Sequence, residues 1–128
     1  MSIYEETFRA RRRDAPNVIE EKKPWGFFRV FASNEKCTVK FLHVNSGQIL
    51  SKQYHEKRDE LWKMLDDGLI VELGEKKFKL KKHDEIFIPK GTVHRLSSEQ
   101  GGDILEVSFG KFDEKDIHRI EDKYGRKN

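Results

Sequence analysis

The 128-residue sequence has one cysteine, Cys37, and no long apolar run. A single cysteine excludes an internal disulfide framework and a multi-cysteine zinc site, and a membrane-spanning helix needs about 20 apolar residues. The first residues, MSIYEETFRARRR, also lack the apolar stretch of a secretory signal. These absences predict a cytoplasmic protein with no membrane partner.

A strong excess of one charge is also missing. The sequence has 26 basic and 23 acidic residues, which gives a formal net charge of +3. Nucleic-acid-binding domains carry a denser basic face, so no nucleic-acid partner is expected. Hydrophobic residues make up 35% of the chain, and nine Phe, three Tyr and two Trp are spread along it. This composition is sufficient for the core of one domain.

Residues 1–22 differ from the rest because they are rich in arginine and carboxylates and show little apolar periodicity. We predict an N-terminal arm there, either a solvated tail or a strand exchanged with a partner, followed by a single domain over residues 23–128. In that domain, short runs of Val, Ile and Phe alternate with charged residues between Gly, Asn and Asp turns. This pattern is typical of an all-β sandwich or barrel.

Strands are predicted near residues 26–33, 36–44, 48–54, 60–65, 69–73, 76–81, 85–88, 92–97 and 103–109. Tight hairpins are predicted at Asp67-Gly68 and Gly74-Glu75, where glycine supplies a positive φ without steric cost. Residues 113–121 have the pattern of a short amphipathic helix with Asp113 as its cap.

Two segments concentrate residue types that bind metal ions. In the first, Gln53 and His55 are two residues apart, so on a strand they share one face, and Glu60 returns to that face after a short turn. In the second, a Pro-Lys-Gly turn precedes His94. Two imidazoles, a carboxylate and an amide oxygen suit one divalent ion such as Zn, Co, Mn, Fe or Ni. The alternative is that both histidines are ordinary packed or exposed strand residues.

These segments resemble the paired motifs of the cupin superfamily. Within it, the chain resembles the type II mannose-6-phosphate isomerase (phosphomannose isomerase) domain, often found behind a mannose-1-phosphate guanylyltransferase. The resemblance covers residues 23–126 and rests on Pro24-Trp25-Gly26, on Gly47 with Gln53-x-His55-x2-Arg58-x-Glu60-x-Trp62, on Ile88-Pro89-x-Gly91-Thr92-Val93-His94-Arg95-Leu96, and on Glu121-Asp122-Lys123-Tyr124-Gly125-Arg126. Three departures affect the motifs but remove no ligand: one extra residue between Glu60 and Gly68, His83 in place of Gly, and Ser98 in place of Asn.

The resemblance implies a cupin double-stranded β-helix, a jelly-roll barrel, with a short C-terminal helix. It also implies that mannose 6-phosphate and fructose 6-phosphate are interconverted through an enediol, with Gln53, His55, Glu60 and His94 as metal ligands. Small cupins are often dimers, so a homodimer is expected. Two other functions stay open: another metal-dependent cupin enzyme (a sugar isomerase, an epimerase or an Fe(II) dioxygenase), and a non-catalytic cupin that binds a sugar phosphate.

Positive charge beside the ligands is expected to serve the substrate. The resemblance implies a catalytic role for Arg58, whose guanidinium suits enediolate oxygens or a phosphate. Strand alternation places Lys40 inside the barrel, where a lysine is costly unless it meets an anion. Lys52, Tyr124 and Arg126 are the further candidates for binding the sugar phosphate. The general base stays open among Lys40, Glu106, His43, Tyr54 and a metal-bound hydroxide.

Overall fold

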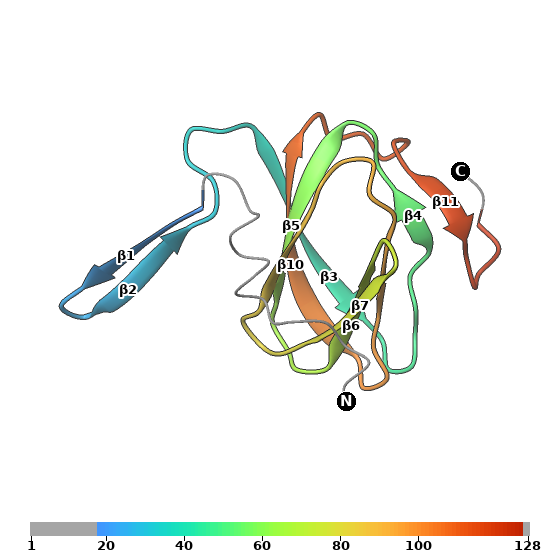
Figure 1. Cartoon of the computed structure of the whole chain (residues 1–128), viewed down its shortest axis with the longest axis horizontal. Helices are drawn as coiled ribbons and strands as arrows, with labels where there is room; N and C mark the ends of the chain where they lie inside the picture. The colour runs from blue at the N-terminus through green and yellow to red at the C-terminus, as the bar shows by residue number, and fades with distance from the viewer. Residues whose placement is uncertain (1–17, 127–128) are drawn as a thin grey trace.

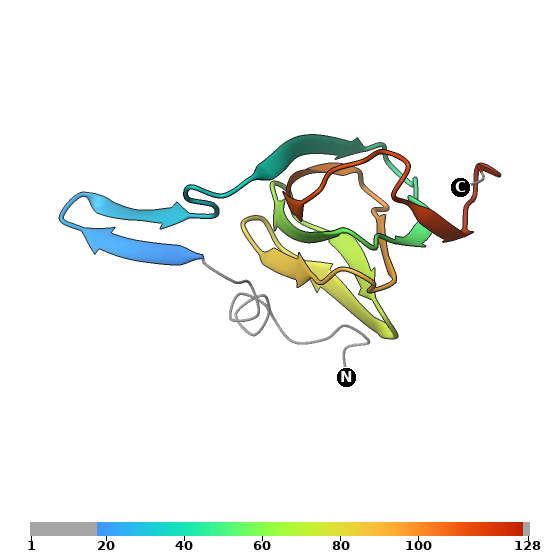
Figure 2. The same ribbon diagram turned by 90° about the horizontal axis from the view of Figure 1, so that it is seen from above.

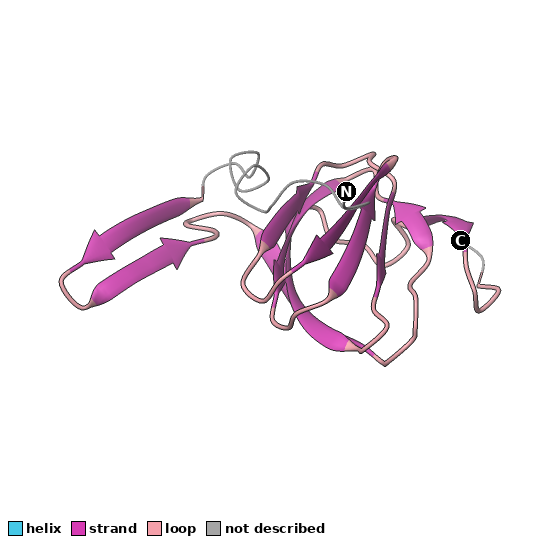
Figure 3. Cartoon of the chain, turned by 60° about the horizontal axis from the view of Figure 1, so that its bottom comes forward, coloured by secondary structure: helices cyan, strands magenta, loops and turns pink. Residues whose placement is uncertain are grey.

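The computed structural model describes residues 18–126, and its regular elements in that range are all β-strands (Figures 1 and 3). No helix long and apolar enough to cross a membrane occurs within these residues. The strands are β1 (Ile19–Lys23), β2 (Gly26–Val30), β3 (Cys37–Val44), β4 (Lys52–Tyr54), β5 (Arg58–Met64), β6 (Leu69–Leu73), β7 (Lys76–Leu80), β8 (Glu85–Ile88), β9 (His94–Ser97), β10 (Gly102–Gly110) and β11 (His118–Glu121).

Two antiparallel sheets form the body of the molecule. One has the strand order β3-β10-β5-β8 and the other β11-β4-β9-β6-β7, so the chain crosses repeatedly between them (Figure 2). One hydrophobic core draws on both sheets, with Met64 and Ile86 from the first and Val71, Phe78 and Leu96 from the second. Sheets that bury a shared apolar face in this way make a jelly-roll barrel. The fold is the expected cupin double-stranded β-helix.

Strand alternation agrees with the sequence in detail. In β7, Phe78 and Leu80 are buried and the lysines between them are exposed, as predicted. The loop Gly74-Glu75 joins β6 to β7 as a two-residue hairpin, with Gly74 at a φ of +60°. The hairpin predicted at Asp67-Gly68 is wrong, because β5 pairs with β8 and β10 while β6 belongs to the other sheet.

The predicted C-terminal helix over residues 113–121 is also wrong. Asp113 accepts a bond from the Lys115 N–H as a cap would, but the Asp116 N–H bonds to the Asp113 carbonyl in one turn that does not continue. From His118 the chain becomes β11, which adds to the edge of β4. Pairing with a neighbouring strand satisfies backbone groups that a two-turn helix would leave open at its ends, so tertiary contact overrides the local pattern.

The first described residues form a hairpin that extends from the barrel (Figures 1 and 2). β1 pairs along its whole length with β2, so the predicted boundary between arm and domain falls inside β1; the rest of the predicted arm, residues 1–17, lies outside the described residues. Arg29 of β2 anchors the hairpin to Glu85 of β8 at 2.7 Å. Trp25 at the turn and Phe27 remain exposed.

Candidate metal centre

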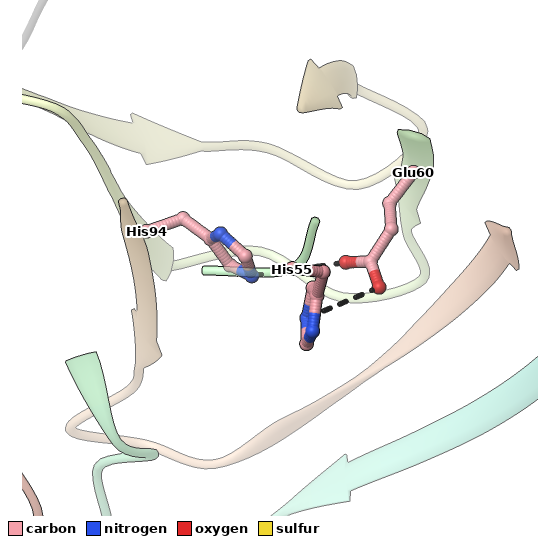
Figure 4. A group of neighbouring side chains, drawn as sticks. All are labelled: His55, Glu60 and His94. Atoms are coloured by element: carbon pink, nitrogen blue, oxygen red, sulfur yellow. Dashed lines mark ion pairs between the residues drawn. The ribbon is translucent and has the colours of Figure 1, made fainter. Parts of the chain in front are cut away.

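Three of the predicted ligands meet inside the barrel. Ligand atoms of His55, Glu60 and His94 all lie within 4.8 Å of one another, and all three residues are buried. The two carboxylate oxygens of Glu60 face one imidazole each, at 3.4 Å from His55 Nε2 and 3.7 Å from His94 Nε2. Figure 4 shows the two rings and the carboxylate directed toward a common point.

Backbone contacts between distant segments create this cluster. Glu60 shares the inward face of β5 with Arg58 and Trp62, as a period of two requires. His94 opens β9 directly opposite Gln53 of β4. The turn before it, where Gly91 has a φ of +80°, donates the Gly91 N–H to the carbonyl of His55 at 2.6 Å. The two metal-ligand motifs are therefore joined through their main chains.

Hydrogen bonds fix which nitrogen of each ring faces the cluster. His55 Nδ1 lies 2.6 Å from the carbonyl oxygen of Asp116, and His94 Nδ1 lies 2.9 Å from that of Thr92. Because a carbonyl only accepts, both Nδ1 atoms carry the hydrogen, and both Nε2 atoms present a lone pair to the cluster. His94 Nε2 is buried and has no hydrogen-bond partner among the described residues. A buried lone pair with no donor fits a cation, so the donor set suits a metal ion.

The protonation state of the two imidazoles also suits a metal ion. Burial lowers the pKa of His55 and of His94, and the opposing negative charge of Glu60 does not outweigh it. Neutral imidazole is the form that binds a metal. At neutral pH the cluster therefore offers two neutral nitrogen donors and a carboxylate.

Arg58 is buried inside this site. Its Nε donates to Glu60 at 3.0 Å, and its Nη1 donates to the carbonyl of Asp113 at 3.2 Å. The indole Nε1 of Trp62 donates to the other oxygen of Glu60 at 3.1 Å. The carboxylate is thus oriented by a donor on each side, one charged and one neutral.

His55 of the cluster borders a cavity of about 180 Å³, whose wall also includes Gln53, Arg58, Lys40 and Glu106. Lys40 Nζ lies 3.9 Å from Glu106 Oε2, so the predicted inward lysine meets an anion. Phe112 contacts both cations, with its ring centre 4.9 Å from Lys40 Nζ and 4.6 Å from Arg58 Cζ. The wall therefore places Lys40, Arg58 and Glu106 beside His55 of the cluster.

Glu106 has the most perturbed carboxyl group of this wall. Burial raises its pKa to about 7, the negative charge of Glu60 acts in the same direction, and Lys40 opposes both. The hydroxyl of Ser108 donates to Glu106 at 3.1 Å. A carboxyl group that titrates near neutral pH can both accept and return a proton.

The structure separates the other candidates. Gln53 lines the cavity, and its Oε1 accepts a bond from the Ser51 hydroxyl at 2.7 Å. Arg126 lines this cavity and also a neighbouring hollow of about 350 Å³, where Tyr124 is found. Lys52 precedes Gln53 on β4, so it points to the opposite face and is not part of the cavity wall.

Two of the five candidate bases lie elsewhere. His43 is exposed and paired with Asp103, and Tyr54 stacks on His118 with 4.7 Å between ring centres. Among the side-chain candidates, Lys40 and Glu106 are the two that the cavity brings together.

Sequence reasoning missed the contribution of residues 112–119. Phe112 supports the two cations, Asp113 and Asp116 supply carbonyls to Arg58 and His55, and Ile117 and Arg119 line the cavity. The helical pattern concealed these roles. The segment that carries this pattern is too short for its apolar spacing to distinguish a helix from a turn followed by an edge strand.

A jelly-roll barrel with a buried set of His and Glu side chains that could hold a metal ion has the architecture of a cupin. The family described as "Mannose-6-phosphate isomerase C-terminal" matches residues 11–122, and the chain belongs to that family.

Relatives of known name include the alginate biosynthesis protein AlgA of Pseudomonas syringae, 34% identical over 91% of this chain and 25% of its own length. The mannose-1-phosphate guanylyltransferase ManC of Salmonella typhimurium is 34% identical over 84% of this chain and 23% of its own. The chain thus spans about a quarter of the length of these relatives.

Solved structures share the fold at low sequence identity. The capsular polysaccharide assembling protein CapF of Staphylococcus aureus superposes with a TM-score of 0.60 at 13% identity, over 81% of this chain and 34% of CapF. A protein from Planctomyces limnophilus gives 0.56 at 21% identity, over 80% and 90% of the two chains. These likenesses establish the architecture alone.

Proposed function

We propose that this protein is a metal-dependent isomerase that interconverts mannose 6-phosphate and fructose 6-phosphate. The observation that carries the proposal is the buried His55–Glu60–His94 cluster, whose His55 shares a cavity wall with Arg58 and with Glu106, a carboxyl group that titrates near pH 7. Membership of the mannose-6-phosphate isomerase C-terminal family supports the choice of substrate. The reaction needs these parts, because a proton must move between C1 and C2 while negative charge develops on the adjacent oxygens.

His55, Glu60 and His94 would hold the metal, with Gln53, which lines the cavity together with His55, as a fourth ligand. A bound divalent ion would act as a Lewis acid that polarises the substrate carbonyl. A mixed nitrogen and oxygen set of this kind suits Zn, Co, Mn, Fe or Ni.

Glu106 is the proposed proton carrier. Its carboxylate takes the hydrogen from C2 of the open-chain aldose and returns it to C1 of the enediol, while the proton on O2 passes to O1. The products then differ from the reactants only in the position of the carbonyl group. Lys40, 3.9 Å from Glu106, adds a positive charge beside the developing enediolate. Charges already in place where negative charge develops usually make the largest contribution to catalysis.

Arg58 and Arg126 add further positive charge to the cavity wall. Arg58 is fixed by Glu60 and the Asp113 carbonyl, so it suits the enediolate oxygens near the ligand cluster. Arg126 stands where the cavity meets the neighbouring hollow, and it suits the phosphate at the far end of the sugar. Arg126 is paired with Asp122 at 2.9 Å, so a bound phosphate would have to compete with this carboxylate for the guanidinium.

A coupled assay of mannose 6-phosphate conversion tests the proposal on the purified chain. The protein is treated with a chelator and then assayed with Zn, Co, Mn or Mg restored one at a time. We expect turnover that depends on the added metal. Protein that binds a metal but converts no mannose 6-phosphate with any of them would overturn the isomerase assignment.

A further inference from the structure

The turn from Asp113 to Asp116 contacts two different parts of the site through its backbone. The Asp113 carbonyl accepts from Arg58 Nη1 at 3.2 Å, and the Asp116 carbonyl accepts from His55 Nδ1 at 2.6 Å. The turn is closed by its own bond from the Asp116 N–H to the Asp113 carbonyl at 2.9 Å. Two acceptors three residues apart therefore orient the imidazole and the guanidinium together.

The side chain of Asp116 ties this turn to the ligand segment. Its two carboxylate oxygens accept from the backbone N–H groups of Glu56 and Lys57, at 2.9 and 3.0 Å. These are the two residues that follow His55, and the carboxylate is buried, with 7% of the residue exposed. Asp116 thus contacts the ligand segment twice, by its carbonyl on the His55 ring and by its carboxylate on the next two peptide groups.

We propose that Asp116 is a positioning residue that aims Nε2 of His55 at the metal cluster. The carboxylate holds residues 56–57 against the turn, and this keeps the Asp116 carbonyl on Nδ1 of His55. The ring is then locked with its hydrogen on Nδ1 and its lone pair on Nε2, which lies 3.4 Å from Glu60. The proposal rests on the metal-dependent function, since an aimed lone pair matters only if the cluster binds a cation.

The role of Asp116 differs in one respect from that of a carboxylate that only stabilises a loop. A carboxylate that only stabilised the loop would leave the choice of ring nitrogen to other groups. Here the main-chain carbonyl of the same residue accepts from Nδ1 at 2.6 Å, and Arg58 Nη2, which can only donate, lies at the longer distance of 3.4 Å from Nε2. Both contacts favour the hydrogen on Nδ1, and the shorter one comes from Asp116. Groups that orient a ligand in this way typically change metal affinity by about 10- to 100-fold when they are lost.

The test compares Asp116→Ala with wild type, using two readouts on the purified chain. The first is the tautomer of His55 in metal-free protein, read from long-range ¹H–¹⁵N couplings of the imidazole. The second is Co²⁺ affinity, read from the visible absorption of the ion. We expect wild type to hold the hydrogen on Nδ1, and the variant to show a tautomer mixture with Co²⁺ binding weakened by about 10- to 100-fold.

Asp66→Ala is the matched control. Asp66 also accepts a backbone N–H from a distant segment, that of Asp103 at 2.8 Å, but it has no contact with the cluster residues. This variant should lose stability while keeping the His55 tautomer and the Co²⁺ affinity of wild type. Asp116→Asn keeps the size of the side chain and one acceptor oxygen. Its His55 tautomer population and its Co²⁺ affinity should lie between those of wild type and Asp116→Ala. If Asp116→Ala does not fold, Asp116→Asn takes its place in the test.

A folded Asp116 variant with an unchanged tautomer and Co²⁺ affinity within about twofold of wild type would overturn the proposal. So would an equal loss of affinity in Asp66→Ala. Failure of the proposed function gives a different result, because wild type would then bind no Co²⁺, or would bind a metal without converting mannose 6-phosphate. The tautomer of the metal-free protein still decides the positioning role in that case.

Discussion

The two ends of the barrel interior are built on the same strands but with opposite chemistry. The inward positions of β5 run from Arg58 and Glu60 to Trp62 and Met64, and all four are buried. At the first end the buried groups are charged and paired with one another; at the second they are apolar and packed. Trp62 stands at the boundary, with its ring in the core and its Nε1 donating to Glu60.

This difference separates stability from function along one strand. Burying apolar side chains stabilises the fold by about 1.5–3 kcal/mol for each large residue. Burying charges costs free energy unless partners compensate, and buried ion pairs contribute little net stability. The apolar end therefore holds the barrel together, and the charged end concentrates perturbed groups where a substrate can use them.

Removal of a proposed metal ligand should have the largest effect on the charged end. His94→Ala deletes a donor whose Nε2 has no other partner among the described residues. We expect loss of metal binding together with turnover, by more than about 10³-fold, since the remaining donors hold the ion less well. Metal content by mass spectrometry and the coupled assay check this. Full activity with a normal metal content would show that His94 is not a ligand.

Glu106→Gln should remove the proton carrier and leave the ligands in place. We expect a loss of turnover of about 10²- to 10⁴-fold, the usual contribution of proton transfer by a positioned group. In wild type, turnover should rise with pH through about 7, because the carboxylate form is the base and the pKa of Glu106 is about 7. The variant should show no such rise in its pH–rate profile. A variant with the wild-type profile would assign the proton to another group.

The same substitution should raise stability at alkaline pH. The pKa of Glu106 is raised from 4.5 in the unfolded chain to about 7 in the fold, so wild type loses stability as pH rises through this interval. The loss corresponds to about 3 kcal/mol for the buried group. Urea unfolding of metal-free protein at pH 5 and pH 8 measures this effect. Relative to wild type, the free energy of unfolding of Glu106→Gln should be higher at pH 8 than at pH 5. Equal differences at the two pH values would contradict the raised pKa.

Arg58→Lys should have a smaller effect on turnover. Lysine keeps the positive charge but cannot donate to both Glu60 and the Asp113 carbonyl as the guanidinium does. We expect turnover to fall by about 10-fold to 100-fold with metal content retained. Arg58→Ala, assayed beside it, should lose more, and a fully active alanine variant would remove Arg58 from the mechanism.

Met64→Ala changes the apolar end and should have the smallest effect on turnover. Met64 is fully buried in the core, so we expect a loss of about 2–5 kcal/mol in the free energy of unfolding. Metal affinity and the rate constant of the folded protein should stay within about twofold, as expected for distant, independent sites. Urea unfolding and the coupled assay measure the two effects. A large fall in the rate constant of folded protein would show that the two ends are coupled.

Much of this architecture could be read from local sequence. Alternating apolar residues gave the strands of the barrel, as Phe78 and Leu80 illustrate, and the spacing of His55, Glu60 and His94 identified three residues that meet in one cluster. The short helix was the main error. Its residues carry a helical pattern but pair with β4 instead, and a sequence window does not contain that neighbour.

Local sequence was enough to predict the all-β class, nine of the eleven strands among the described residues, and the His and Glu residues that cluster, because side-chain periodicity and motif spacing are local properties. Which groups surround those residues depends on how the chain folds. Asp116 lies 61 residues from His55 in the chain, yet its carbonyl selects the nitrogen that faces the cluster. Glu106 became a group with a pKa near 7 only by burial beside Glu60. Orientation and proton affinity depend on burial and on distant partners, and the folded barrel supplies both.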